Sequence, residues 1–130
     1  MPSEPGPVVR VEILVRPDCP NRTMALAVVE RAIAAAGVPV DLEVVDLEAE
    51  AQAKDLRCLG SPSVLVDGLD VEPGATGRRD FTISCRLYRC GTGLQGWPEE
   101  SWVRSAVLVA SAQPASIGPA SPGTSSATSP

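Results

Sequence analysis

Histidine is absent from this sequence of 130 residues, and no two cysteines stand in a Cys-X-X-Cys arrangement. Without histidine the chain has neither a Ser-His or Cys-His catalytic pair nor an imidazole ligand for a metal ion. The cysteine spacings do not match the paired ligands of a structural zinc site; the four residues are Cys19, Cys58, Cys85 and Cys90. A reactive thiol must therefore be activated by its position on a helix, by neighbouring charge or by a bound metal.

Aromatic residues are also scarce, at 3% of the chain, whereas hydrophobic residues make up 44%, so the core must be mostly aliphatic. The net charge is -5 and no basic cluster is longer than Arg78-Arg79, which argues against a nucleic-acid partner. No apolar run is long enough to span a membrane, and no apolar leader follows a basic start. These absences favour a cytoplasmic protein with reduced thiols and no membrane partner.

Composition divides the chain into three parts. Residues 1–7 contain three prolines and form a flexible lead-in, residues 8–110 form one folded domain, and residues 111–130 are rich in Ser, Pro and Ala. We expect this tail to be disordered, because it has too few apolar side chains to offset the entropy lost on ordering.

The folded part begins with a regular strand–helix–strand pattern. Residues 8–15 alternate as a strand, with one apolar face made of Val9, Val11, Ile13 and Val15. Residues 21–36 repeat apolar side chains at helical spacing, and Gly37 is a typical helix stop. Residues 40–47 alternate as a second strand. This unit predicts two parallel strands joined by a right-handed crossover.

The next elements are shorter. We predict a helix over 48–58, a strand over 63–66, a tight turn at Asp67-Gly68 and a returning antiparallel strand over 69–72.

An extra extended segment over 81–88 follows, where alternation predicts one shared face for Phe81, Ile83, Cys85 and Leu87. Residues 91–96 are predicted as a glycine-rich loop, and the last helix starts at Pro98 and ends near residue 110.

Two loops carry a specific resemblance. Asp18-Cys19-Pro20-Asn21 joins the first strand to the first helix, and Gly60-Ser61-Pro62-Ser63-Val64 leads into the third strand. With the order β, α, β, α, β, β, α, they resemble the thioredoxin fold from about residue 8 to residue 110. The resemblance implies an α/β domain whose four-stranded mixed sheet is flanked by helices. It also implies that the two loops face each other, that Pro62 is cis, and that backbone groups of Ser61 contact extended thiol substrates.

A closer resemblance is to a group of small bacterial thioredoxin-like proteins, some of which are labelled alkylmercury lyase. Five short segments carry it in order: Asp18–Asn21, Gly60–Ser63, Val66–Gly68, Asp70–Pro73 and Ser84–Tyr88. This chain departs from ordinary thioredoxins at Arg22, which stands where they have a second cysteine. The usual disulfide within that motif cannot form here.

Cys19 is the first candidate for chemistry, because the start of a helix favours a thiolate. Arg16 and Arg22 would favour the thiolate and Asp18 would oppose it, while an inert half-buried thiol is the alternative. Cys85 is either a small core residue or a second thiol that resolves a mixed disulfide or shares a soft metal.

The other candidates have simpler interpretations. Cys58 is expected to pack beside Leu56 and Leu59, and a disulfide between Cys85 and Cys90 is conceivable but not implied by their spacing. Arg86 could pair with a carboxylate or assist a thiolate, although an exposed arginine is usually just solvated.

Three functions follow from these residues. The first is a thiol-disulfide oxidoreductase without the Cys-X-X-Cys motif, working through Cys19 with or without Cys85 and acting on a protein or a small molecule. The second is a non-catalytic binding module that uses the Pro62 loop. The third is the handling of a soft metal or an organomercurial by Cys19 and Cys85, with Asp18 as the adjacent acid. We expect no bound cofactor.

Overall fold

The structure of the chain, a computed structural model, describes residues 8–91 and 93–112. Its elements follow the order β1 (Val9–Val15), α1 (Arg22–Ala36), β2 (Val40–Asp46), α2 (Ala51–Leu56), β3 (Leu59–Ser61), β4 (Ser63–Val66), β5 (Leu69–Asp70), β6 (Thr82–Cys85), β7 (Tyr88–Cys90), β8 (Gly93–Gln95) and α3 (Glu100–Ser111). The predicted lead-in over 1–7 lies outside the described residues, as does the tail from residue 113 onward. α3 runs through Ser111, just into the range predicted as tail.

The strand–helix–strand unit has the predicted arrangement. β1 and β2 are parallel, with partners from Val9 and Val40 to Val15 and Asp46. α1 lies between them in the chain and ends where Gly37 adopts a left-handed conformation, φ 69°, that suits glycine. The Gly37 N–H donates to the carbonyl of Ile33, which closes the last turn.

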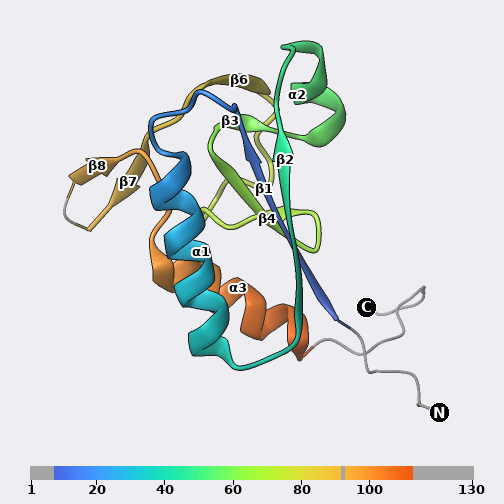
Figure 1. Cartoon of the computed structure of the whole chain (residues 1–130), viewed down its shortest axis with the longest axis vertical. Helices are drawn as coiled ribbons and strands as arrows, with labels where there is room; N and C mark the ends of the chain where they lie inside the picture. The colour runs from blue at the N-terminus through green and yellow to red at the C-terminus, as the bar shows by residue number, and fades with distance from the viewer. Residues whose placement is uncertain (1–7, 92, 113–130) are drawn as a thin grey trace.

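A four-stranded mixed sheet lies at the centre of the domain (Figure 1). Its strand order is β2-β1-β4-β5, with β4 antiparallel to both β1 and β5. Asp67 and Gly68 both have positive φ, 49° and 84°, and form the predicted tight turn between β4 and β5. This mixed α/β arrangement is compatible with a thioredoxin-like fold.

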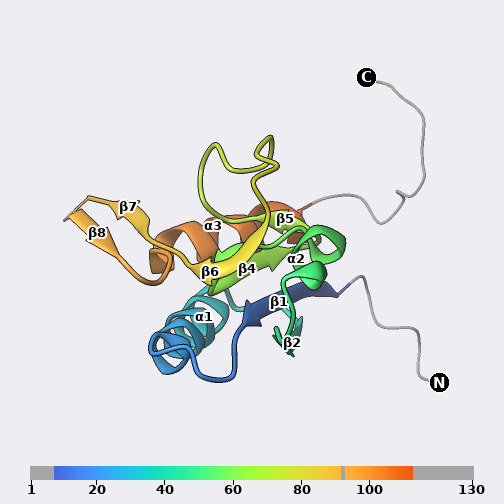
Figure 2. The ribbon, with the colours of Figure 1, turned by 90° about the horizontal axis from the view of Figure 1, so that it is seen from above.

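Helices cover both faces of this sheet (Figure 2). α1 and α3 pack over the face that carries the predicted apolar residues of β1, namely Val9, Val11, Ile13 and Val15. Leu14 points to the opposite face, where it meets Leu47, Leu65 and Ala53 of α2. The alternation predicted for β1 is confirmed.

The segment from residue 81 to 88 differs from its predicted single alternation. β6 pairs in parallel with β3, but Leu59 lies opposite Thr82 while Ser61 lies opposite Cys85, so β6 carries one extra residue. Such a bulge moves all following side chains to the other face. Cys85 is consequently exposed, whereas Ile83 packs against the cluster around Leu14. The predicted shared face for Cys85 and Ile83 is therefore wrong.

The prediction of a plain loop over 91–96 is also wrong. β7 and β8 form a small antiparallel hairpin in which Arg89 lies opposite Leu94. The hairpin projects at the end of the molecule where α1 begins (Figures 1 and 2). An added Cβ at Gly96 would collide with the Asn21 side chain, so the hairpin returns in direct contact with the residue that precedes α1.

Nothing in the described ranges suggests insertion into a lipid bilayer as a helix: none of the helices there combines the required length and hydropathy.

Candidate functional site

Three of the four predicted site residues line one small cavity at the surface. This cavity has a volume of about 120 Å³, and its walls are Arg16, Asp18, Cys19, Pro20, Ser61 and Cys85. Pro62, the fourth predicted residue, directly follows Ser61 and is buried. The structure therefore brings two thiols from distant parts of the chain to the same cavity.

Cys19 lies in a tight turn between β1 and α1. Its N–H donates to the Arg16 carbonyl at 3.0 Å, and its own carbonyl accepts the Arg22 N–H at 3.2 Å. The two neighbouring guanidinium groups are both engaged with carboxylates: Arg16 binds Asp18 at 3.2 Å and Arg22 binds Asp46 at 2.8 Å. The positive charge expected to favour a Cys19 thiolate is thus partly balanced within the chain.

Ser61 joins the two thiol-bearing segments. Its side chain accepts the Arg16 N–H at 3.0 Å, and its carbonyl accepts the Arg86 N–H at 3.1 Å. The peptide bond between Ser61 and Pro62 is cis. The Ser61 carbonyl, part of the backbone expected to meet an extended substrate, is therefore already bonded to the segment that carries Cys85.

Arg86 is buried behind this loop, with its side chain only 3% exposed. Its guanidinium binds both oxygens of Asp70, at 2.7 and 3.0 Å, and also Glu72 and the Ser63 hydroxyl, each at 2.8 Å. Burial acts to lower the pKa of Arg86, but hydrogen bonds and charge from Asp70, Tyr88 and Glu72 outweigh it and raise the pKa. Breaking the contact between a buried arginine and two carboxylates costs unfolding free energy. Arg86 therefore holds the segment that carries Cys85 in place.

Tyr88 completes the support of the proline loop. Its hydroxyl donates to the Pro62 carbonyl, its ring lies 4.4 Å from the Arg86 guanidinium, and its pKa is raised by burial. Gly60 allows the close approach, because a Cβ there would lie 2.7 Å from the Arg86 Cβ and its φ is +132°. The segment that follows Cys85 is thus braced directly against the Pro62 loop.

This support was only partly predictable. Pairing of Arg86 with a carboxylate was one of the expected alternatives, but its burial and its partners Ser63, Asp70 and Glu72 were not expected. A signal existed in the sequence, because the Asp70–Pro73 and Ser84–Tyr88 segments both resemble those of small bacterial thioredoxin-like proteins. The first segment supplies two carboxylates two residues apart, and the second supplies an arginine between apolar residues. Such groups form charge-assisted hydrogen bonds with one another.

The two remaining cysteines lie outside the cavity wall. Cys58 is fully buried, its thiol donates to the Gly60 carbonyl at 3.3 Å, and burial raises its pKa, as a packing residue should show. Cys90 is half-buried, and its pKa is raised by burial and by Glu99. All four cysteines are free thiols, so Cys85 and Cys90 form no disulfide.

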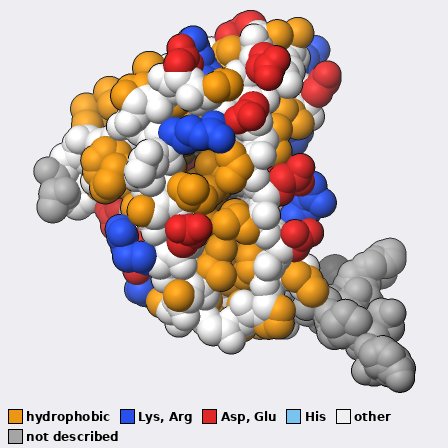
Figure 3. All heavy atoms as spheres, viewed as in Figure 1, with side chains coloured by type: hydrophobic (Ala, Val, Ile, Leu, Met, Phe, Trp, Pro, Cys, Tyr) orange, Lys and Arg blue, Asp and Glu red, His pale blue; other side chains and the backbone are white. Residues whose placement is uncertain are grey.

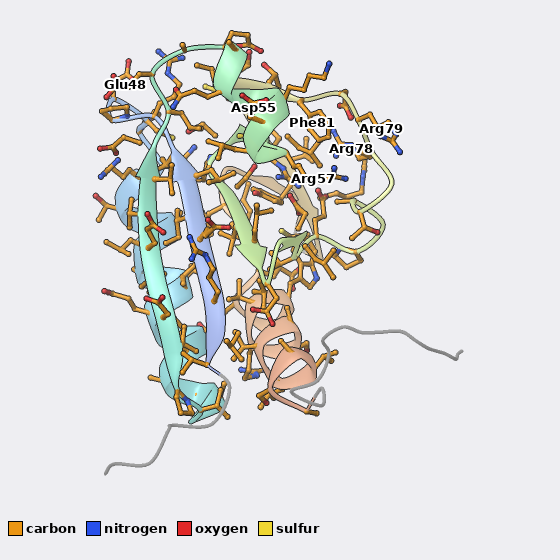
Figure 4. The ribbon with its side chains drawn as sticks, turned by 90° about the vertical axis from the view of Figure 1, so that its right-hand side faces the viewer. Glu48, Asp55, Arg57, Arg78, Arg79 and Phe81 are labelled. Atoms are coloured by element: carbon orange, nitrogen blue, oxygen red, sulfur yellow. The ribbon has the colours of Figure 1, made fainter. Side chains whose placement is uncertain are left out.

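Arginines around Phe81 form a separate cluster near α2 (Figure 4). The Arg57 guanidinium lies 5.6 Å from the Phe81 ring, and Arg78 binds Asp80 at 2.7 and 3.1 Å. The small pocket at Arg57 and Phe81 has no residue in common with the Cys19 cavity. Within residues 8–91 and 93–112, no group of three or more His, Cys, Asp or Glu side chains is placed to hold a metal ion.

One curated protein gives a significant match to this chain. It is named Probable Thioredoxin, comes from Methanothermobacter marburgensis, and is 31% identical over 75 residues. The matched stretch covers 57% of this chain and 88% of that protein. No family model and no solved structure matches significantly.

Proposed function

Because this chain belongs to the thioredoxin family, we propose that it carries out thiol-disulfide exchange through Cys19, with Cys85 as the second thiol. The observation that supports this most directly is that both thiols line one cavity beside the cis Ser61-Pro62 bond. Arg22 occupies the place of the usual second cysteine, so a partner thiol must come from another segment. The cytoplasm, where thiols are kept reduced, suits this chemistry.

The reaction has two exchange steps. The Cys19 thiolate attacks one sulfur of the substrate disulfide, forms a mixed disulfide, and releases the other half as a thiolate that takes a proton. The Cys85 thiolate then attacks the Cys19 sulfur and releases the second half. The substrate disulfide is reduced by two electrons and Cys19 and Cys85 become a disulfide. External thiol reduces that disulfide and returns the protein to its starting state.

Neighbouring residues have supporting roles in this proposal. Ser61 and Pro62 form the wall against which the substrate lies. Arg86 is a positioning residue, since its guanidinium binds Asp70, Glu72 and Ser63 while its N–H holds the Cys85 segment on the Ser61 carbonyl.

Serine variants of single cysteines test the proposal. Reduced protein is mixed with 2-hydroxyethyl disulfide, and its oxidation is followed by acid quenching and mass spectrometry. Cys19→Ser should react at least a hundredfold more slowly, and Cys85→Ser should accumulate the mixed disulfide on Cys19. Cys90→Ser is the matched control, because Cys90 lies outside the cavity wall, and it should behave as the wild type does.

The same experiment separates this proposal from a non-catalytic role. A Cys19→Ser protein that kept the wild-type rate would contradict exchange through Cys19 and would favour a binding module built on the Pro62 loop.

A second candidate, organomercurial cleavage, is favoured by the presence of Asp18 in the same cavity wall as the two thiols. Two thiolates would bind the mercury of an organomercurial cation. The thiol that binds mercury second would pass its proton to the Asp18 carboxylate. The carbon–mercury bond would then break as the carbon takes that proton, leaving a hydrocarbon and mercury held by two thiolates. With phenylmercury as substrate, benzene release measured by gas chromatography should be lost in Asp18→Asn. Absence of benzene from the wild-type protein would exclude this activity and leave disulfide exchange unaffected.

A further inference from the structure

Beyond the bulge in β6, the chain alternates regularly between exposed and buried side chains. Cys85, Leu87 and Arg89 are exposed, whereas Arg86 and Tyr88 between them are buried. The exposed face that includes Cys85 therefore continues along the residues that follow it.

The hairpin widens this exposed face. Leu94 lies directly opposite Arg89 across β7 and β8, which puts the two side chains on one face. Leu87 is 64% exposed and Leu94 is 61% exposed. Hydrophobic side chains reach the surface over the hairpin and the loop before α1 (Figure 3). We call Cys85, Leu87, Arg89 and Leu94 the Cys85 strip.

Single exposed leucines are common on proteins, so exposure alone does not make the strip a binding surface. The distinguishing feature is continuity with the cavity, because Cys85 is both the first residue of the strip and part of the cavity wall. The strip is also anchored by contacts from behind: Arg86 binds Asp70, Tyr88 binds the Pro62 carbonyl, and Gly96 rests against Asn21. A surface that is ordered before binding loses less entropy when a partner docks.

The Ser61 carbonyl already accepts the Arg86 N–H, which leaves one of its two lone pairs for a substrate. A polypeptide that reaches the thiols gains further contacts by extending over neighbouring surface. The exposed residues after Cys85 supply such a surface, with apolar contacts and one positive charge. Arg89 belongs to no ion pair within residues 8–91 and 93–112, so its charge is available to a partner.

We propose that the Cys85 strip binds an extended segment of a protein disulfide substrate, an inference that rests on the exchange function proposed above. An extended chain advances roughly 3.3 Å per residue, so Leu87 lies about 7 Å beyond Cys85 and Arg89 about twice as far. With the substrate cysteine in the cavity that Cys19 and Cys85 share, the preferred substrate has an apolar side chain two residues from that cysteine and an acidic side chain four residues away. A small disulfide has no side chains to fill the strip.

Peptide disulfides test this preference. One peptide has leucine two residues to either side of its single cysteine and glutamate four residues to either side; its comparison peptide has serine at all four positions. Each is used as a symmetrical disulfide, and the second-order rate constant for oxidation of the reduced protein is measured. We expect the leucine and glutamate peptide to react about tenfold faster with the wild type.

Variants of the strip residues test whether the strip causes the rate preference between the two peptides. Leu87→Ser combined with Leu94→Ser should remove most of the tenfold preference between the two peptides, and Arg89→Glu should reduce it further at low salt. Leu69→Ser is the matched control, because Leu69 is also 61% exposed but lies in β5, and it should keep the full preference.

The outcomes are separable from those of the proposed function. Equal rates for both peptides, or a preference that survives in the double variant, would overturn the strip while exchange with 2-hydroxyethyl disulfide remained intact. A wild-type protein that reacts with no disulfide would overturn the exchange function and the strip together.

Discussion

The two thiols of the cavity belong to segments that fold for different reasons. Cys19 follows β1 and precedes α1, two regular elements whose apolar residues pack into the main core. Cys85 ends a short strand with a bulge and is followed by Arg86, which is buried among carboxylates. The first segment is organised by hydrophobic burial and local hydrogen bonds, and the second by one network of buried charges. The geometry of the site therefore depends on interactions of two unlike kinds.

Arg86→Met is expected to cause the largest loss of unfolding free energy. Removing the guanidinium leaves Asp70 buried without its partner, which should cost about 3–5 kcal/mol of unfolding free energy. Arg31→Met is the control, because its ion pair with Glu100 is exposed and should cost less than about 1 kcal/mol. Urea unfolding measures both. A loss below about 1 kcal/mol in Arg86→Met would show that the buried network does not hold the Cys85 segment.

A smaller effect is expected for Gly60→Ala. The new Cβ would lie 2.7 Å from the Arg86 Cβ, and φ of +132° strains any residue except glycine, so we expect a loss of about 2–3 kcal/mol. Gly37→Ala also places a side chain at positive φ, but nothing lies within 4 Å of its Cβ, so about 1 kcal/mol is expected. Thermal unfolding compares the two. Equal losses would mean that backbone strain alone, without the contact to Arg86, explains the effect.

The smallest expected effect is a change in the alkylation rate of Cys90, which ends β7 beyond Cys85. Burial and Glu99 raise the pKa of Cys90, because both disfavour its thiolate. Glu99→Gln removes the negative charge, so the pKa of Cys90 should fall and its alkylation at a fixed pH near 8 should become about two to three times faster. The pH dependence of iodoacetamide labelling, read by mass spectrometry, measures the shift. An unchanged or higher pKa in Glu99→Gln would show that Glu99 does not act on this thiol.

The sequence predicted the Cys19 segment better than the Cys85 segment, and the reason is the range of the interactions. The alternation in β1 and the helical spacing in α1 are local patterns that report directly which face is buried. The bulge in β6 arises from pairing with β3, far away in the chain, so alternation within residues 81–88 could not reveal it. The hairpin of β7 and β8 escaped prediction because its glycines indicated a loop.

The residues of the candidate site show the same contrast between local patterns and long-range contacts. The two loop motifs pointed to Cys19 and Ser61, the Ser84–Tyr88 segment pointed to Cys85, and these three residues line one cavity. The burial of Arg86 was not predictable from its own neighbourhood, since it depends on Asp70 and Glu72 meeting it across the fold. Patterns in sequence identify reactive side chains, whereas their support depends on partners brought together only by the complete fold.

The separation of the two thiols along the chain links oxidation to global stability. A Cys-X-X-Cys disulfide closes a ring of a few residues and hardly restricts the unfolded chain. A disulfide between Cys19 and Cys85 would instead enclose β1's exit loop, both first helices and most of the sheet, and would restrict the unfolded chain by about 4 kcal/mol in the loop-entropy treatment. Each turnover would then raise and lower the free energy of unfolding of the domain.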